Sequence, residues 1–355
     1  IIIIILLLSF SNMQQWNYSA DILEKIDKNG ENYRIFKSED NSKTLVKIYK
    51  DTISILTNKA IQYLDEKQFH LQGPVTMING RDTLYCNKMI FWYELDSLHA
   101  TGNVDCKFKD AYLKTDSLIY VKSEGYRGYS FYTYNKSNFY DQHYKMEAKQ
   151  ISYIDRIQKM NLSGNPMVES KNQGMSGEYI ELQFIDSLLS QAKIEDDGYV
   201  YNYHRAKIKT LGDFQFFKDE MKGNFLNIEM KDGNLQNVLI QGMAESLYYV
   251  ANDSSLLIGE NIATGDTIRL NYIDNNLSKI RVAGGARGIF IPEIDNSSID
   301  STLHYTSNSI DYLLQEQKSY LKGDVKIKYQ DTELNAGDVE VDWNTNHLFA
   351  FNDGE

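Results

Sequence analysis

The chain is poor in the residues that mark several common protein classes. Its 355 residues include three prolines, two cysteines and six histidines, and no two histidines lie at metal-ligand spacing. There is no Cys-x-x-Cys pair, which argues against a zinc or redox motif. Lys and Arg number 37 against 49 for Asp and Glu, so the net charge is −12. Nucleic-acid binding needs a basic patch, so this balance argues against that class, and equally against adhesion to an anionic membrane surface.

Long apolar runs are also missing, apart from a short one at the start. Residues 1–11 read Ile-Ile-Ile-Ile-Ile-Leu-Leu-Leu-Ser-Phe-Ser, which is too short to span a bilayer. An apolar core followed by small residues is typical of the end of a signal peptide and predicts export; a short buried strand is the alternative. We expect residues 1–11 to be a signal-peptide remnant and residues 12–46 a lead-in, with the apolar spacing of a short helix at residues 18–28.

No catalytic constellation stands out. The carboxylates concentrate in predicted turns, where Asp stabilises the turn itself, and they do not form acid–base pairs. The Gly-rich stretch at residues 284–288 lacks the Lys-Ser/Thr of a phosphate loop. His70 and His99 fall on the outward phase of two predicted strands, where a repeated surface position explains them better than a metal site. We therefore predict no enzymatic activity, no cofactor and no metal.

What the sequence does contain is one short phrase repeated nine times. Each copy is a polar or small residue, an aliphatic residue, a spacer, and an aliphatic or aromatic residue. A turn signal rich in Asp or Asn follows, and then usually a second alternating run that carries a Gly. Such a repeat indicates one supersecondary unit stacked many times. The copies begin at Ala60, Met89, Ser117, Gln150, Tyr179, Phe225, Thr267, Ser309 and Asp338.

The periodicity and spacing of the copies predict the fold. Alternation with period two indicates antiparallel strands, and a Gly inside a strand marks a bulge that bends it. The first aliphatic residues of the copies are 29, 28, 33, 29, 46, 42, 42 and 29 residues apart. The unit is therefore about 29 residues, with insertions near 121–144, 193–220 and 285–303. We predict an all-β chain over residues 47–355, an elongated open β-jelly roll or solenoid of stacked hairpins with a V-shaped apolar groove.

The two cysteines lie on the arms of one predicted hairpin. With a turn near Asp96, Cys86 and Cys106 face each other on the same side of the hairpin. An oxidising compartment would permit a disulfide there. Two buried free thiols are the other interpretation, because Cys packs as a small apolar residue.

The predicted strands have one apolar face and one polar face. In the first copy, Ile61 and Tyr63 are expected to face the interior with Leu71 and Val75. Gln62, His70, Gln72 and Thr76 are expected to face outward. We expect the first aliphatic residue of every copy to face the same interior.

Residues 147–155, Glu-Ala-Lys-Gln-Ile-Ser-Tyr-Ile-Asp, are followed by a Leu-x-Gly return strand at residues 162–164. This pattern resembles the OstA-like family of periplasmic lipopolysaccharide-transport proteins, which includes LptA, LptC and the N-terminal domain of LptD. The resemblance covers roughly residues 48–355. It implies a slightly twisted, open β-jelly roll whose groove holds lipid A acyl chains, in modules that join head to tail into a periplasmic bridge.

The resemblance implies a periplasmic, outer-membrane-associated protein that binds and transports lipopolysaccharide. Its expected partners are other jelly-roll proteins, by strand addition, and an outer-membrane barrel assembly. The chain is long for this family and would be either a long bridge protein or the front part of an LptD-like protein, cut at its C-terminus. A structural or adhesive β-solenoid with a filled core and a Tyr-rich surface at residues 126–134 is the alternative. The expected lipid-binding residues are Ile61, Tyr63, Leu71, Val75, Ile90, Trp92, Val104, Leu118, Tyr120, Ile151, Tyr153, Ile180, Leu182, Leu226 and Ile228.

Overall fold

The computed structural model describes residues 16–28, 31–39, 44–108, 111–122, 128–186, 188–209, 212–251, 254–274, 276–293, 300–343, 345 and 347–352. The expected signal-peptide remnant at residues 1–11 lies outside the described residues. In the described part, every element is a β-strand except one short 3-10 helix, Asp155–Ile157. No helix in this part is long and apolar enough to cross a membrane. All nine repeated phrases lie in strands, so the all-β prediction is confirmed.

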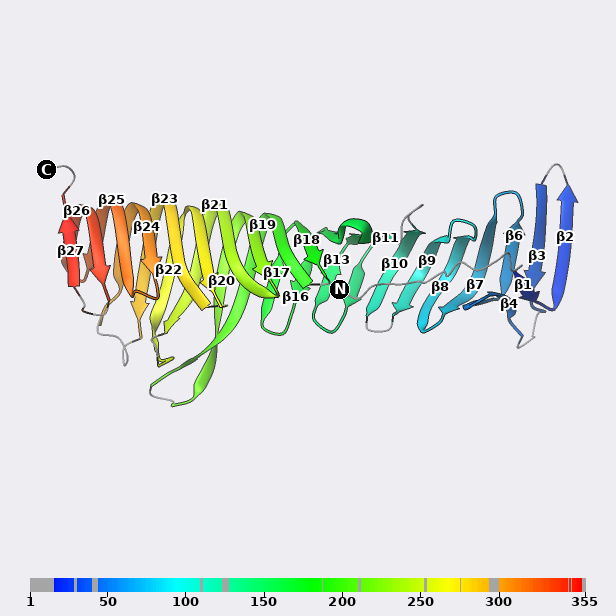
Figure 1. Cartoon of the computed structure of the whole chain (residues 1–355), viewed down its shortest axis with the longest axis horizontal. Helices are drawn as coiled ribbons and strands as arrows, with labels where there is room; N and C mark the ends of the chain where they lie inside the picture. The colour runs from blue at the N-terminus through cyan, green and yellow to red at the C-terminus, as the bar shows by residue number, and fades with distance from the viewer. Residues whose placement is uncertain are drawn as a thin grey trace. The chain divides into compact units, whose positions relative to one another are not determined.

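The chain divides into two compact units, Ile1–Pro166 and Met167–Glu355. In each unit, the strands pair antiparallel with neighbouring strands, many but not all of which are consecutive in the chain (Figure 1). The strands of unit 1 are β1 Asn17–Ser19, β2 Ile22–Lys28, β3 Glu31–Lys37, β4 Val46–Lys50, β5 Ile53–Thr57, β6 Lys59–Tyr63, β7 Gln68–Asn79, β8 Asp82–Trp92, β9 Ser97–Lys107, β10 Tyr112–Lys122, β11 Tyr129–Tyr134, β12 Ser137–Tyr140, β13 Lys145–Ala148, β14 Gln150–Ile154 and β15 Lys159–Ser163.

The strands of unit 2 range from 3 to 20 residues in length. They are β16 Met167–Glu169, β17 Gln173–Ser176, β18 Tyr179–Ile185, β19 Leu188–Lys207, β20 Phe214–Lys231, β21 Asn234–Ala251, β22 Leu257–Ile273, β23 Asn276–Pro292, β24 Leu303–Leu313, β25 Lys318–Tyr329, β26 Thr332–Asp342 and β27 His347–Phe351. The segment expected as an insertion at 193–220 forms the extended ends of β19 and β20.

The helix expected at residues 18–28 is wrong, because this segment forms β1 and β2. β2 pairs with β3 from Ile22 opposite Lys37 to Lys28 opposite Glu31. The i, i+4 spacing of Ile22 and Ile26 that suggested a helix is also an even spacing, which places both residues on one face of a strand. Leu23, on the other face, is 63% exposed.

Each long strand of unit 1 bends at a bulge and so contributes to two walls. The first half of β7 pairs with β6, and its second half pairs with β5. The register shifts at residues 73–74, between the two halves. We call the layer that contains β5 wall A and the layer that contains β6 wall B. Wall A comprises β1, β4, β5, residues 75–79 of β7, residues 82–86 of β8, residues 104–107 of β9, the start of β10, and β12 and β13. Wall B comprises β2, β3, β6, the remaining halves of β7 to β10, and β11, β14 and β15.

The glycines of the return strands lie at this bend, as the sequence predicts. Gly73, Gly102 and Gly242 have φ values of +93°, +77° and +73°. A Cβ on any of the three would lie within about 3.0 Å of an Asn side chain, that of Asn58 between β5 and β6, of Asn87 on β8, or of Asn224 on β20 respectively. Left-handed backbone and close approach both favour glycine. A repeated Asn–Gly contact therefore fixes where each strand turns from one wall to the other.

The cysteine register differs from the predicted one by two residues. Cys106 of β9 lies opposite Leu84, and Cys86 of β8 lies opposite Val75 on the other side. The bulge between Tyr85 and Lys88 displaces the pairing that a simple hairpin centred at Asp96 would give. Both thiols are free and buried, so no disulfide is formed.

Candidate functional site

The inner faces of walls A and B form the apolar interior of unit 1. Of the residues expected there, seven are almost fully buried on these faces: Leu71, Val75, Val104, Leu118, Tyr120, Ile151 and Tyr153. The interior also contains the rings of Phe36, Phe69, Phe91, Phe131 and Phe139, which the sequence prediction missed. For Phe69 the signal was alternation, since it lies two residues from Leu71, which was expected inside. Phe91 lies between Ile90 and Trp92, which were expected inside, so the predicted strand phase placed it on the outer face.

The two walls contact each other through these side chains. One cavity of about 20 Å³ is lined by Met77 and Leu84 of wall A and by Leu98, Leu118 and Phe131 of wall B. A cavity of this size holds about one water molecule, whereas a cavity of about 150 Å³ is needed for benzene. This cavity is too small for an acyl chain, which would enter here only if the walls separate.

Aromatic residues of the N-terminal strand reach across the interior. The ring of Tyr18, on β1, stacks on Phe36 at 4.7 Å, and Trp16 contacts Phe69 and Phe91 with centroids 5.7 Å apart. The Tyr18 hydroxyl donates a hydrogen bond to Gln62 Oε1, at 3.3 Å. Burial raises the pKa of Tyr18, so its hydroxyl stays protonated and can donate at neutral pH.

Four of the residues predicted to face the interior lie on the opposite face. Ile61 and Tyr63 of β6, and Ile90 and Trp92 of β8, are half-buried on the outer surface. Their neighbours point inward instead: Ala60, Met89 and Phe91 are buried, and so is Gln62, which was expected outside and is 4% exposed. The expectation that every first aliphatic residue faces one interior is therefore wrong for the first two copies.

The Asn–Gly contact explains this difference in phase. Asn58 and Asn87 lie at the bend, and the inward position is two residues later, at Ala60 and Met89. In the third copy Asp116 precedes inward Leu118 by the same spacing. Ala60, Met89 and Leu118 are 29 residues apart, whereas counting from Ile90 gave a step of 28. The odd step was the signal that the first two copies had been aligned one residue too late.

The outer face of wall B carries a cross-strand row in which Ile and His alternate. Ile61 lies opposite His70, His70 opposite Ile90, and Ile90 opposite His99. His99 Nε2 is 3.0 Å from Ser117 Oγ. Burial lowers the pKa of His70, so this ring is neutral at pH 7. The two histidines are thus a repeated outer position, and among the described residues no cluster of His, Cys, Asp or Glu could hold a metal.

The interior of unit 2 is apolar over part of its length and polar elsewhere. Ile180, Leu182, Leu226 and Ile228, all expected inside, are buried there. A second group of buried residues forms a hydrogen-bonded cluster. Tyr312 donates to the hydroxyl of Tyr305 at 2.8 Å, and Tyr305 donates to Asn261 Oδ1. Burial raises the pKa of Tyr312 to about 12, so the cluster is uncharged at neutral pH.

Comparisons with known proteins give a structural likeness but no sequence match. No protein-family model matches the chain, and no curated protein matches it. Among solved structures, the chain is similar to LptH, the LptA-homologous periplasmic component of the lipopolysaccharide transport device of Pseudomonas aeruginosa. The likeness covers 38% of this chain and 82% of LptH, with 12% identity and a TM-score of 0.29. At this TM-score it supports no conclusion about function.

Proposed function

We propose that this chain binds the acyl chains of a lipopolysaccharide-like amphiphile between its two walls, as an exported, periplasmic transport protein. The observation that carries the proposal is the character of the two inner faces of unit 1. They are lined by Leu, Ile, Val, Met and Phe from successive strands, and the strands join them along one bent corner. In the described part of unit 1, strand pairings join strands of one wall, as β4–β5 and β5–β7 do in wall A and β3–β6 and β11–β14 do in wall B.

Opening such a structure replaces one apolar contact by another. Separation of the walls alone would expose the inner side chains to water, which is unfavourable. An acyl chain that enters between the walls removes the same surface from water, so its binding offsets the cost of opening. Similar side chains at every strand would give many weak, equivalent sites, which suits a lipid that has to move along the protein.

The resemblance to the OstA-like family supports the same function and suggests the partners. They would be other jelly-roll transport proteins and an outer-membrane barrel assembly. In the described part of unit 1, β2 pairs only with β3, so its other edge presents backbone groups to which a partner strand could add.

Photo-crosslinking tests the proposal with two adjacent residues. Leu118 points into the interior and Ile119 lies on the outer face opposite His99. A photoreactive residue at 118 should capture added lipopolysaccharide, and the same residue at 119 should not. Equal capture at both positions, or none at 118 in a folded protein, would reject the proposal.

The filled-core β-solenoid is the second candidate, and the small cavity between the walls favours it. Its expected recognition surface at residues 126–134 is only partly at the surface, and Tyr126 lies outside the described residues. Tyr129 and Phe131 are buried and belong to the interior of unit 1, and only Tyr134 of this strand is exposed. Absence of lipid capture at residue 118 would select this second function.

A further inference from the structure

The ends of β19 and β20 form a ribbon of two strands that is also held at its tip, because Lys207 bridges to Leu256 and its backbone N–H donates to the carbonyl of Ser255 at 2.8 Å. Tyr203 lies opposite Lys218 and Lys207 opposite Phe214, with regular pairing between them. The pairing of β20 with its other neighbour, β21, stops at Glu220. Figure 1 shows the two strand ends extending past the other strands of unit 2. A ribbon of two strands is only marginally stable in water by itself. The residues that form it therefore need an explanation.

One face of the ribbon pairs a cation with an aromatic ring on nearly every rung. Lys207 lies opposite Phe214, Arg205 opposite Phe216, and Tyr203 opposite Lys218. The guanidinium of Arg205 is 4.9 Å from the ring centroid of Phe214 and 5.5 Å from that of Phe216. Lys207 Nζ is 4.8 Å from the Phe214 ring. These are cation–π distances, so the face is an ordered ladder.

The other face of the ribbon is turned toward the rest of unit 2. Phe217 contacts the ring of Tyr249, with centroids 4.9 Å apart, and the backbone N–H of Tyr249 donates to Asp219 at 3.0 Å. The cation–aromatic face is therefore the free one. Phe214 and Phe216 are 42% and 63% exposed on it.

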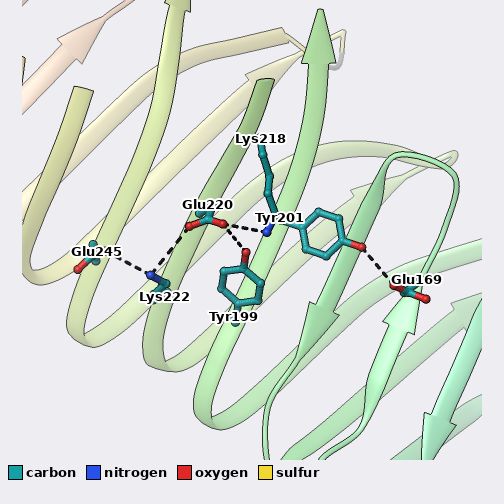
Figure 2. A network of polar contacts seen from close by, with 7 residues as sticks. All are labelled: Glu169, Tyr199, Tyr201, Lys218, Glu220, Lys222 and Glu245. Atoms are coloured by element: carbon teal, nitrogen blue, oxygen red, sulfur yellow. Dashed lines mark hydrogen bonds and ion pairs between the residues drawn. The ribbon is translucent and has the colours of Figure 1, made fainter. Parts of the chain in front are cut away.

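Carboxylates neutralise the near end of this ladder. Glu220 accepts hydrogen bonds from Lys218 at 2.9 Å and from the Tyr199 hydroxyl at 2.6 Å, and Lys222 lies 3.6 Å from Glu245 (Figure 2). Tyr201 donates to Glu169 at 3.4 Å (Figure 2). The hydrogen bonds and ion pairs of Glu220 hold the pKa of its carboxyl below the usual value.

The far end of the ladder differs. Within the part of the chain that the structure describes, no carboxylate forms an ion pair with Arg205 or Lys207. These two cations and two exposed Phe rings thus lie together at the projecting end, on a chain whose net charge is −12.

We propose that the ribbon end is a docking site for an anionic bilayer surface. Aromatic side chains are favourable at the membrane interface, and Lys and Arg near an anionic leaflet bind its headgroup phosphates. The surplus of negative charge elsewhere on the chain would be repelled by the same surface, which favours approach with the ribbon end first. The expectation from net charge alone, that the chain avoids anionic membranes, does not apply to this local patch.

Vesicle flotation with the full chain tests the proposal. Phosphatidylcholine vesicles are compared with vesicles that contain about one third phosphatidylglycerol, an anionic fraction that sets the surface potential. The charge variant is Arg205→Glu/Lys207→Glu, and the ring variant is Phe214→Ser/Phe216→Ser. The matched control is Lys326→Glu/Lys328→Glu, which makes the same charge change at two exposed positions of β25.

The wild-type chain should bind anionic vesicles about tenfold more tightly than neutral ones, and the charge and ring variants should each lose most of that preference. The control variant should keep it. Equal binding to both vesicle types, unchanged binding of the charge variant, or an equal loss in the control would overturn the proposal. Binding of dextran sulfate without any vesicle binding would also overturn it, since the partner would then be a soluble polyanion.

Two checks separate this result from other effects. If circular dichroism shows that the charge variant is unfolded, the milder Arg205→Gln/Lys207→Gln variant has to show the loss instead. The vesicles contain no lipopolysaccharide, and lipid capture at Leu118 should be the same in the ribbon variants. Failure of one proposal therefore leaves the other unaffected.

Discussion

At the scale of single residues, the contact between Asn87 and Gly102 carries much of the fold. Gly102 has a left-handed backbone, and a Cβ there would lie 2.8 Å from Asn87 Nδ2. Gly80, in a turn, has a similar φ of +61° but nothing within 4 Å. The two glycines therefore share a left-handed backbone, but only at Gly102 would a Cβ meet a neighbouring side chain.

This pair gives the first prediction. Gly80→Ala should lower the free energy of unfolding by about 1–2 kcal/mol, the cost of a left-handed non-glycine residue. Gly102→Ala should cost about 1–3 kcal/mol more, because Asn87 has to move and the bulge shifts. Urea unfolding measures both. Equal costs would show that the Asn–Gly contact does not determine the bend.

The buried cysteines give a prediction on pH dependence. Burial raises the pKa of the Cys86 thiol from 9.0 to about 12, and it also raises that of Cys106. The folded state keeps a proton that the unfolded state loses, so this stabilisation is complete below pH 9 and is lost as the pH rises toward 12. The free energy of unfolding should fall above about pH 9, and Cys86→Ala should remove about one proton from that slope. An unchanged slope would contradict the burial of this thiol.

The residue scale is also where prediction from sequence was weakest. Leu118, Ile151 and Ile180 were placed on the inner face correctly, and Ile61 and Ile90 were not. In the first two copies both faces of the strand are apolar, since Ile90 and Trp92 alternate with Met89 and Phe91. Hydrophobic alternation cannot distinguish two apolar faces, and the register of the bulge decides between them.

At the scale of elements, strand phase can be tested by charge. Met89→Lys would place an unpaired ammonium among buried side chains and should lower the free energy of unfolding by about 3–5 kcal/mol. Ile90→Lys, on the half-buried outer face, should cost about 1–2 kcal/mol, as for a partly lost apolar side chain. Thermal or urea unfolding of the two variants provides the comparison. A larger cost at residue 90 would mean that the strand is turned the other way.

Most strands could be predicted because their alternation and turn signals are local. All nine repeated phrases and the bulges at Gly73 and Gly102 were found in this way. The segment at residues 18–28 was misread because four-residue spacing fits both a helix and a strand, and only pairing with β3 distinguishes them. The ribbon was read as an insertion, because its cation–aromatic rungs form between residues such as Arg205 and Phe216, on two different strands.

At the scale of the whole molecule, sequence indicates an apolar interior but gives no measure of how tightly it is filled. Tyr18, Phe36 and Phe69 meet across the interior because of three-dimensional packing that no spacing rule contains. The proposed function therefore depends on whether walls A and B of unit 1 can separate around a lipid.

The most direct measurement is the distance between the walls with and without lipopolysaccharide. Arg81 is an exposed residue in a turn at the end of wall A, and Leu95 is an exposed residue in a turn at the end of wall B. Both turns are remote from the bent corner. Lys67 lies in another turn of wall B. Spin labels at Arg81→Cys and Leu95→Cys, with Cys86 and Cys106 replaced by Ala, report on the opening. Labels at Lys67→Cys and Leu95→Cys are the control within one wall. The account predicts that lipopolysaccharide lengthens the distance between the walls and leaves the control distance unchanged; an unchanged distance between the walls in the presence of bound lipid would contradict it.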